Sequence, residues 1–276
     1  MLQQTRVAAV IPRYEKFLRR FPSVQKLAAA RESSVLAQWS GLGYYRRARN
    51  LHAAAKIIAQ EKMFPHNADA WRLLPGIGRY TAAAVASIAF NQPVAVLDGN
   101  VARVLRRVLG GSLAQKKLWT AAQSLLDPTR PGDFNQAMME LGATVCLPRQ
   151  PQCTACPIRK FCRTRGAGPS TIAKPRQHKR ETTYSLTRRA ESIVFIRRSE
   201  NESLMPGMWE LPEVTSPRAS DEYLFSVRHS ITVTNFTVRV VARSRADGPW
   251  VRISRLNALP LTGLAKKILR VAKIIQ

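Results

Sequence analysis

The sequence predicts a protein of two domains, an all-α domain followed by an α/β domain. Apolar residues recur at helical spacing over much of 1–165, whereas β-branched and alternating runs dominate from residue 189. Between them, 166–188 is rich in Gly, Pro, Ser, Thr, Lys and Arg and has no apolar period. We therefore expect a helical domain over 1–165, a basic linker over 166–188 and a second domain over 189–276.

The charge of the chain favours a polyanionic partner. Among its 276 residues, 44 are Lys or Arg and 17 are Asp or Glu, which gives a net charge of +27. Basic side chains gain free energy by displacing counterions from phosphates, so nucleic acid is the expected partner. A merely soluble cationic surface is the alternative. The start of the chain does not resemble a signal peptide and no apolar run is long enough for a membrane span, so we expect a cytoplasmic, nucleoid-associated protein without a membrane partner.

Residues 1–62 predict helices that are interrupted by a glycine-containing turn. Helical spacing is shown by Val7, Val10, Ile11, Tyr14 and Leu18. The turn Gly41-Leu42-Gly43-Tyr44-Tyr45 precedes three arginines. Tandem aromatics beside arginines can stack on a base and hold its phosphate. The alternative is a turn whose tyrosines both lie in the core.

The stretch Leu74-Pro75-Gly76-Ile77-Gly78 predicts a helix-hairpin-helix. A helix of small residues, Ala82 to Ala89, follows it. Glycines at Gly76 and Gly78 leave backbone N–H groups accessible at a helix N-terminus, where a DNA phosphate can bind. A plain turn between two helices would need one glycine rather than this pair.

An acidic residue stands where an apolar run changes into a basic helix. The run Val94-Ala95-Val96-Leu97 leads to Asp98, and the helix Ala102 to Leu109 follows. A carboxylate at that place should accept helix N–H bonds and act as a fixed anion. A simple helix N-cap is the alternative. Asn100 could orient Asp98 or a substrate.

All four cysteines lie between Cys146 and Cys162, in the spacing C-x6-C-x2-C-x5-C. Thiolates at Cys146, Cys153, Cys156 and Cys162 suit either a zinc ion or an iron–sulfur cluster. The wide outer spacings favour the larger [4Fe-4S] cluster. Two disulfides are the remaining alternative, although nothing else indicates a secreted chain.

The surroundings of the cysteines are basic. Five cations surround the thiols, at Arg149, Arg159, Lys160, Arg163 and Arg165. A metal cluster there could be a scaffold for a DNA-facing loop rather than a redox centre. The preceding helix, Phe134 to Ala143, carries one acid, Glu140, on an otherwise apolar surface.

The C-terminal part predicts strands and a final helix. Strand patterns occur at 192–196, 230–234 and 236–241, and a basic helix closes the chain over 261–275.

Taken together, these residues resemble the adenine DNA glycosylases of the MutY type. The resemblance rests on M-L-Q-Q-T, G-L-G-Y-Y, L-P-G-I-G, L-D-G-N, F-N-Q-A-M-M and the four-cysteine loop. It implies an all-α helix-hairpin-helix glycosylase core with a [4Fe-4S] cluster, joined to an α/β Nudix-like domain. It also implies a monomer that removes adenine mispaired with 8-oxoguanine or guanine in double-stranded DNA, in base excision repair.

The same resemblance assigns roles to residues. Asp98 matches the carboxylate that stabilises an oxocarbenium-like sugar, with a transient covalent adduct as an open alternative. Asn100 and Tyr80 match positions that assist it, and Glu140 matches one that lines the adenine pocket. Residues that enter the duplex when adenine is flipped out are matched by Leu2, Gln4 and Tyr44.

The endonuclease III type is the nearest alternative family. It shares the hairpin and the cysteine loop but cleaves the backbone through a Schiff base, which requires a primary amine just after the hairpin. Tyr80 stands there, and no lysine follows before Lys116. Lyase chemistry through that position is therefore not expected.

Two departures from the family pattern affect the expected activity. The family has a glutamate two residues before the methionine of M-L-Q-Q-T, where it protonates the departing adenine; that methionine is Met1 here. Because general acid assistance is worth about 10² to 10⁴ in rate, we expect this polypeptide to be nearly inactive, and a non-catalytic iron–sulfur DNA-binding protein is the competing hypothesis.

The second departure concerns recognition of the opposite base. The family often has Phe-Ser-His where this chain has Ile231-Thr232-Val233, so Thr232 is the expected hydroxyl donor to 8-oxoguanine. His229 or Asn235 could add donors. The segment Leu204 to Pro212 resembles the family's Nudix-like part, but no run of glutamates follows it. A magnesium-dependent pyrophosphatase is therefore not expected.

Overall fold

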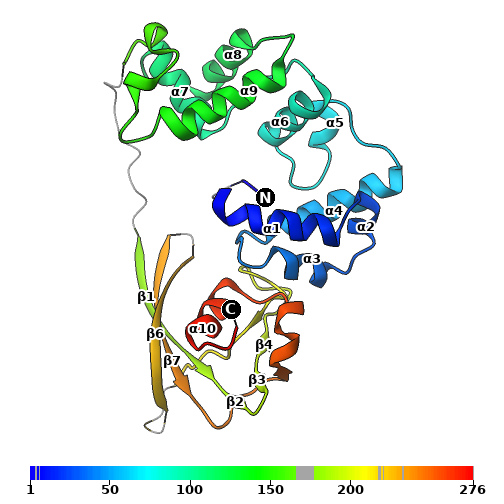
Figure 1. Ribbon diagram of the computed structural model, residues 1–276, viewed down its shortest axis with the longest axis vertical. Helices are drawn as coiled ribbons and strands as arrows, with labels where there is room; N and C mark the ends of the chain where they lie inside the picture. The colour runs from blue at the N-terminus through cyan, green and yellow to red at the C-terminus, as the bar shows by residue number, and fades with distance from the viewer. Residues whose placement is uncertain are drawn as a thin grey trace. The chain divides into compact units, whose positions relative to one another are not determined.

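The computed structural model divides into two compact units (Figure 1). One unit joins Met1–Gln60 to Lys174–Gln276, and the other is Glu61–Ala173. The helices expected within one domain over 1–165 are therefore shared between two units. The described residues are 1–3, 5, 7–165, 177–216, 219, 221–231 and 233–275.

Four helices form the start of the first unit, as the sequence predicts: α1 (Val7–Arg20), α2 (Val24–Ala28), α3 (Glu32–Trp39) and α4 (Arg46–Glu61). Helix α1 buries Val10 and Phe17, and the Phe17 ring meets the Trp39 ring edge-on at 6.1 Å. The other members of the predicted apolar set are exposed, namely Val7, Ile11, Tyr14 and Leu18. The spacing thus identified the helix but not the face that it buries.

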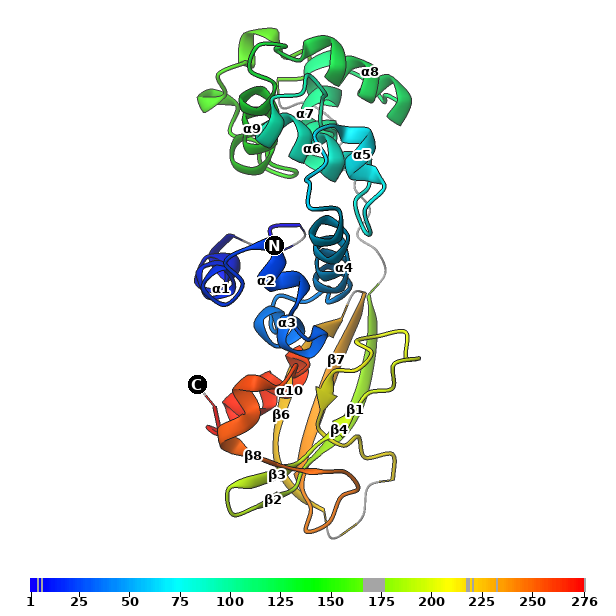
Figure 2. The ribbon, with the colours of Figure 1, turned by 90° about the vertical axis from the view of Figure 1, so that its right-hand side faces the viewer.

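A mixed three-stranded sheet forms the C-terminal body of the same unit. Its order is β1 (His178–Leu186), β7 (Thr234–Ala242) and β6 (Glu222–Ile231), with β1 parallel and β6 antiparallel to β7. Helix α10 (Gly263–Val271) lies against this sheet (Figure 2) and buries Ile268 completely. The α/β character predicted for this part of the chain is confirmed.

Two small antiparallel sheets flank the main sheet. One contains β2 (Arg188–Arg189), β3 (Ser192–Val194) and β8 (Trp250–Arg252), the other contains β4 (Ile196–Arg197) and β5 (Trp209–Glu210), and a 3-10 helix spans Ile253–Ala258. Glu210 is 3% exposed and pairs with Arg198 at 2.5 Å, while Thr262 donates to its other oxygen at 3.1 Å. Burial raises the pKa of Glu210, although Arg198 opposes that shift.

The predicted linker is wrong beyond His178, because β1 begins there. The first four residues of β1 are exposed and polar, and only its last three, Tyr184–Leu186, are buried. Because the exposed part of β1 is polar, its composition resembles that of a linker, which explains why the strand was predicted as one. Residues 166–176 lie outside the described part of the chain.

The strand expected at 230–234 is correct only in part, because its residues belong to two strands. Strand β6 ends at Ile231 and β7 begins at Thr234. The expected strand at 236–241 lies within β7, and the expected helix at 261–275 corresponds to α10. Apolar β-branched residues at the end of β6 and directly before β7 made the two strands look like one.

The C-terminal body packs directly on the N-terminal helices of its unit. Met208 is fully buried in the core that contains Trp39. Arg49 of α4 donates to the Pro206 carbonyl at 2.7 Å, and the Ser40 hydroxyl donates to the Leu261 carbonyl at 2.5 Å. These contacts explain why residues 1–60 group with the C-terminal body.

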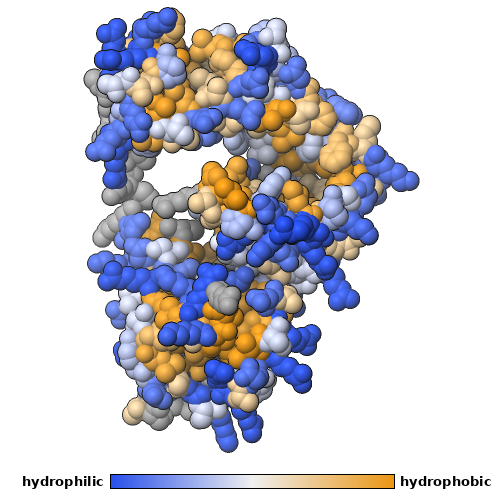
Figure 3. Space-filling view, in the orientation of Figure 1, coloured by the Kyte–Doolittle hydropathy of each residue, from blue (hydrophilic) through white to orange (hydrophobic). Residues whose placement is uncertain are grey.

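The second unit is helical: α5 (Ala68–Arg72), α6 (Arg79–Phe90), α7 (Gly99–Leu109), α8 (Gln115–Leu125) and α9 (Pro131–Glu140). A π-helical turn at Leu141–Val145 continues α9, and 3-10 turns occur at Cys153–Ala155 and Arg159–Phe161. Hydrophilic side chains are widespread on the visible face of each unit (Figure 3), in keeping with the net charge. Among the described residues, no helix combines the length and apolarity needed to cross a membrane.

Candidate active site

Asp98 is the N-cap of α7, and its carboxylate accepts a helix N–H bond, as expected. Its Oδ1 accepts a hydrogen bond from the backbone N–H of Val101 at 2.7 Å, and its backbone is extended. The positive end of the helix dipole stabilises a carboxylate at this position. The half-buried side chain is thereby held in one orientation at the surface of the unit.

The chain that leads to Asp98 is held by side-chain amides rather than by a neighbouring strand. Asn135 of α9, which is 1% exposed, accepts from the Val96 N–H at 3.0 Å and donates to the Val94 carbonyl at 2.8 Å. Gln123 of α8 accepts from the Ala95 N–H at 2.9 Å. Because buried backbone groups must be paired, these amides fix the path of the backbone up to Asp98.

Asn100 lies beside Asp98 and is oriented by an arginine. Its Nδ2 donates to Oδ2 of Asp98 at 3.3 Å, while its Oδ1 accepts from Arg103 Nη2 at 2.8 Å. The arginine can only donate, so it determines which end of the Asn100 amide faces the carboxylate. Of the two roles left open for Asn100, the structure shows the contact with Asp98.

Tyr80 lies in the first turn of α6 in the same unit. Its hydroxyl donates to the sulfur of Met139 at 3.2 Å. Burial raises the pKa of Tyr80, and the negative charge of Asp98 raises it further. Tyr80 therefore stays protonated at neutral pH and is available only as a neutral hydroxyl.

Glu140 is exposed at the end of α9, directly before the π-helical turn. The carbonyl of Glu140 accepts from Thr144 Oγ1 at 2.8 Å. The bonds that hold Asp98 come from Asn100 and Val101 and do not involve Glu140. Its predicted role in lining a base pocket stays a prediction.

The predicted helix-hairpin-helix is formed by α5 and α6. Gly76 has φ +74°, a left-handed conformation that a residue with a side chain rarely adopts. Gly78 is the exposed N-cap of α6, and a methyl group added there would meet no atom within 4 Å. The N-terminus of α6 is therefore open to an approaching anion, as the glycine pair predicts.

The cysteine loop packs on the basic side of α7. Arg103 donates to the Cys146 carbonyl at 2.8 Å, and Arg107 donates to the Leu147 carbonyl at 2.7 Å and to Cys146 Sγ at 3.3 Å. The Cys162 thiol donates to the Arg107 carbonyl at 3.4 Å. One helix thus carries Asp98 at its start and the cysteine loop along its side.

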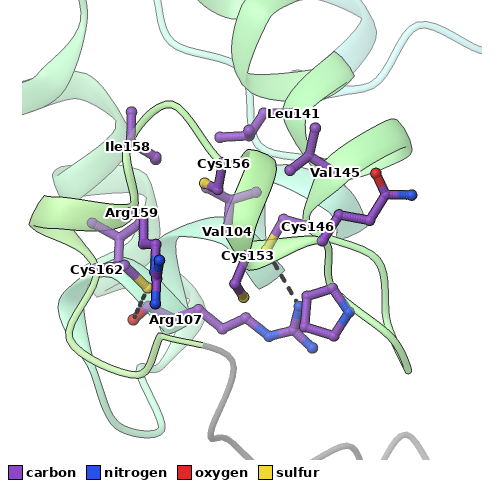
Figure 4. Close-up of a pocket in the computed structure, with 13 residues that line it drawn as sticks. Val104, Arg107, Leu141, Val145, Cys146, Cys153, Cys156, Ile158, Arg159 and Cys162 are labelled. Carbon is purple, nitrogen blue, oxygen red and sulfur yellow. Dashed lines mark hydrogen bonds between the residues drawn. The ribbon is translucent and has the colours of Figure 1, made fainter.

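The four cysteines are free and line one cavity with Val104 and Arg107 of α7 (Figure 4). Within the described part of the chain, no three His, Cys, Asp or Glu side chains are grouped so that they could hold a metal ion. The loop therefore places the four thiols around one cavity but does not group three of them at a single metal-binding point.

The first unit carries the residues expected to enter a duplex. Leu2 is 58% exposed and Tyr44 is 52% exposed, whereas Tyr45 is buried. The alternative of two core tyrosines is therefore wrong for Tyr44, which has φ +49° and points outward from the turn. Gln4 lies outside the described residues.

The residues expected to read the opposite base surround the β6–β7 turn. Thr232 lies outside the described residues. Beside it, the Ser230 hydroxyl donates to Asn235 Oδ1 at 2.7 Å, and the Asn235 amide donates to Gln177. Burial, followed by the charge of Lys267, lowers the pKa of His229.

Known proteins identify the family of this chain. A family model described as the HhH-GPD superfamily of base excision DNA repair proteins matches residues 1–127. The human adenine DNA glycosylase is 51% identical over 174 residues, which cover 60% of this chain and 32% of that protein. A solved thermostable thymine-DNA glycosylase is 31% identical with a TM-score of 0.55, over 59% of this chain and 78% of the solved chain. The chain belongs to the HhH-GPD superfamily.

Other relatives extend the similarity over more of the chain. The adenine DNA glycosylase of Arabidopsis thaliana is 38% identical over 270 residues, which are 80% of this chain and 42% of that protein. A solved endonuclease III–DNA complex, with a TM-score of 0.53, 22% identity and coverage of 59% of this chain and 79% of the other, shares the fold. The chain spans 32% of the human, 33% of the mouse and 52% of the rat relative.

Several residues that build this HhH-GPD site were not singled out from the sequence. Asn135 and Gln123 act on backbone groups that lie 41 and 28 residues away, respectively. Arg103 and Arg107 were expected only as members of a basic helix. An amide within an apolar helix face is the one signal that could have identified Asn135.

The packing of α7 against the π-helical turn gives a test of this geometry. A methyl group added at Gly142 would lie 2.7 Å from the Asn100 Cβ and 3.1 Å from the Asn100 backbone. We expect Gly142→Ala to lower the free energy of unfolding by about 1–3 kcal/mol, because the core cannot accept it without a backbone shift. Urea denaturation measures this.

Gly99→Ala is the matched control, since a methyl group at Gly99 meets no atom within 4 Å. Its free energy of unfolding should be unchanged or higher by up to about 1 kcal/mol. Equal stability of the Gly142→Ala and Gly99→Ala variants would contradict the close approach of α7 to the turn.

Proposed function

We propose that this protein is a monofunctional DNA glycosylase that removes adenine from A:8-oxoguanine or A:G mispairs in base excision repair. The observation that carries the proposal is the fixed carboxylate of Asp98, held by the Val101 N–H and by the Asn100 amide. Its similarity to adenine DNA glycosylases from animals and a plant supports the choice of adenine.

Cleavage of an N-glycosidic bond develops positive charge on the sugar. A preorganised anion beside that charge lowers the barrier, because it does not have to be reoriented during the reaction. The helix N-terminus and Asn100 hold the Asp98 carboxylate in this way. Tyr80, kept protonated by its raised pKa, can donate a hydrogen bond but cannot act as a base at neutral pH.

The residue after the hairpin distinguishes this proposal from an endonuclease III-like lyase. A Schiff base needs a primary amine. The position after Arg79 holds a phenol, and the next lysine is Lys116, in α8. We therefore propose base release without strand cleavage.

Adenine release from a duplex that contains A opposite 8-oxoguanine tests the proposal. Single-turnover rates should be measured for this chain and for the form extended by the residues encoded immediately upstream. Asp98→Asn should lower the rate by at least about 10² to 10³, the size of effect seen when one electrostatic contact to a transition state is lost. Binding of the lesion duplex should be unchanged.

Asp127→Asn is the control, because Asp127 is an aspartate of the same unit whose bonds are to Thr129 and Arg130. A normal rate in Asp98→Asn would remove Asp98 from the mechanism. Lesion-dependent binding with no free adenine from either form would instead support the non-catalytic DNA-binding hypothesis.

We further propose that Cys146, Cys153, Cys156 and Cys162 hold a [4Fe-4S] cluster. Four unpaired thiols around one cavity are a suitable donor set, and the Arg107 guanidinium already donates to one of the sulfurs. When bound, the cluster would supply four covalent ties within the loop. Its role would then be to hold the exposed cations Arg159 and Lys160 in place for DNA phosphates.

Cys153→Ser should therefore lose iron and acid-labile sulfide together with broad visible absorption. The affinity for DNA should fall at the same time, because the cations of the loop are no longer fixed. Thr154→Ala, an exposed neighbour in the same turn, should keep both properties. Protein that carries zinc instead of iron would contradict the cluster assignment.

The C-terminal body is proposed to be a Nudix-like domain that recognises the opposite base. Its mixed sheet packed by α10 supports the domain assignment. The polar pair Ser230 and Asn235, on the two strands β6 and β7, supplies hydroxyl and amide groups. Such groups can recognise the edge of an oxidised guanine by hydrogen bonds.

A further inference from the structure

Arg47, in the first turn of α4, does not point into solvent as a phosphate-binding arginine would. Its Nη1 donates to the Met1 carbonyl at 3.0 Å and also to the Gln3 carbonyl. Its Nη2 donates to Thr5 Oγ1 at 2.8 Å. The guanidinium therefore binds Met1 and Gln3, on both sides of Leu2, and also Thr5.

The same guanidinium also holds the glycine-containing turn. Its Cζ lies 5.5 Å from the ring centre of Trp39 and 5.3 Å from that of Tyr44. The Trp39 indole in turn donates to the Gly43 carbonyl at 3.2 Å. Cation–π contacts of this kind favour a fixed ring orientation. Tyr44 is thus tied to Arg47 although its backbone is in the unfavourable left-handed region.

Leu2 and Tyr44 therefore project from two parts of the chain that are both held by the Arg47 guanidinium. Leu2 is 58% and Tyr44 is 52% exposed, and Thr5 adds a contact from its hydroxyl to the Leu42 carbonyl at 3.4 Å. Burial lowers the pKa of Arg47, but a guanidinium remains charged at neutral pH. Its bonds to the segment are accordingly charge-assisted.

We propose that Arg47 is a positioning residue that locks the Met1–Thr5 segment to the Tyr44 turn, so that Leu2 and Tyr44 enter a duplex as one rigid wedge. This rests on the proposed function and on the expectation, from the family resemblance, that these side chains enter the duplex when adenine is flipped out. A rigid wedge avoids the entropy cost of ordering two separate segments on binding. Arg47 then determines selectivity for a duplex that can be opened, rather than general affinity for DNA.

A lysine cannot replace Arg47 in this role. The planar fork of arginine reaches the carbonyls, the hydroxyl and both rings at once, whereas an ammonium is a single point charge. Arg47→Lys should therefore keep general DNA affinity and lose most of the selectivity. This outcome would distinguish a positioning role of Arg47 from an effect of its charge alone.

The experiment uses duplexes in which 2-aminopurine replaces the adenine opposite 8-oxoguanine, with an undamaged duplex of the same length for comparison. The fluorescence of 2-aminopurine rises when the base leaves the stack. The wild-type chain should give this rise, and Arg47→Ala should abolish it. The ratio of affinities for the two duplexes should fall about tenfold, as expected for the loss of bonds from a charged donor.

Arg46→Ala is the matched control, since Arg46 is an exposed neighbour with the same charge. It should weaken binding to both duplexes equally and keep the fluorescence rise. Thr5→Val removes a single partner of Arg47 and should reduce the fluorescence rise partially. If Arg47→Ala does not fold, this variant tests the positioning role of Arg47.

A full fluorescence rise in folded Arg47→Ala would contradict the positioning role of Arg47 and leave the proposed function intact. A full rise in both Thr5→Val and Arg47→Lys would do the same. The wild-type chain could instead bind the duplex without a fluorescence rise. That result would contradict base flipping, on which the proposed function depends, and with it the positioning role of Arg47. Thermal unfolding of each variant shows whether it is folded.

Discussion

The second unit depends on the hydrogen bonds that the guanidinium of Arg103 donates. This guanidinium donates to Asn100 Oδ1 at 2.8 Å, to the Gly142 carbonyl at 2.6 Å and to the Cys146 carbonyl at 2.8 Å. Hydrogen bonds from a charged donor are worth about 1.5–3 kcal/mol each. Helix α7 therefore cannot move without disturbing both the group that orients Asp98 and the start of the cysteine loop.

The first unit uses arginines in the same way. Arg47 joins the N-terminal segment to the Tyr44 turn, and Arg49 joins α4 to Glu32, to Glu200 and to the Pro206 carbonyl. Many of the described basic side chains are exposed, but these half-buried guanidinium groups act inside the protein. A strongly basic sequence thus does not by itself show which cations meet DNA.

The sequence predicted the features that depend on neighbouring residues. The N-cap at Asp98 follows from an apolar run that meets a helix, and the hairpin follows from Gly76 and Gly78. Features set by distant partners were not predictable. Asn135 pairs with backbone 41 residues away, and β1 was mistaken for a linker because its pairing with β7 joins Tyr184 to Val240. The sequence marks Asn135 as an amide within an apolar helix face but does not show which backbone it pairs with, and the pairing of β1 with β7 leaves no local signal.

Hydrogen exchange in the Arg103→Met variant tests the central claim most directly. The backbone N–H of Val101, which donates to Asp98, and the backbone N–H groups between Cys146 and Cys162 should both exchange faster than in the wild-type protein, because one cation secures them together. Faster exchange in the cysteine loop with unchanged protection at Val101 would show that Asp98 is held independently of Arg103 and would contradict this account.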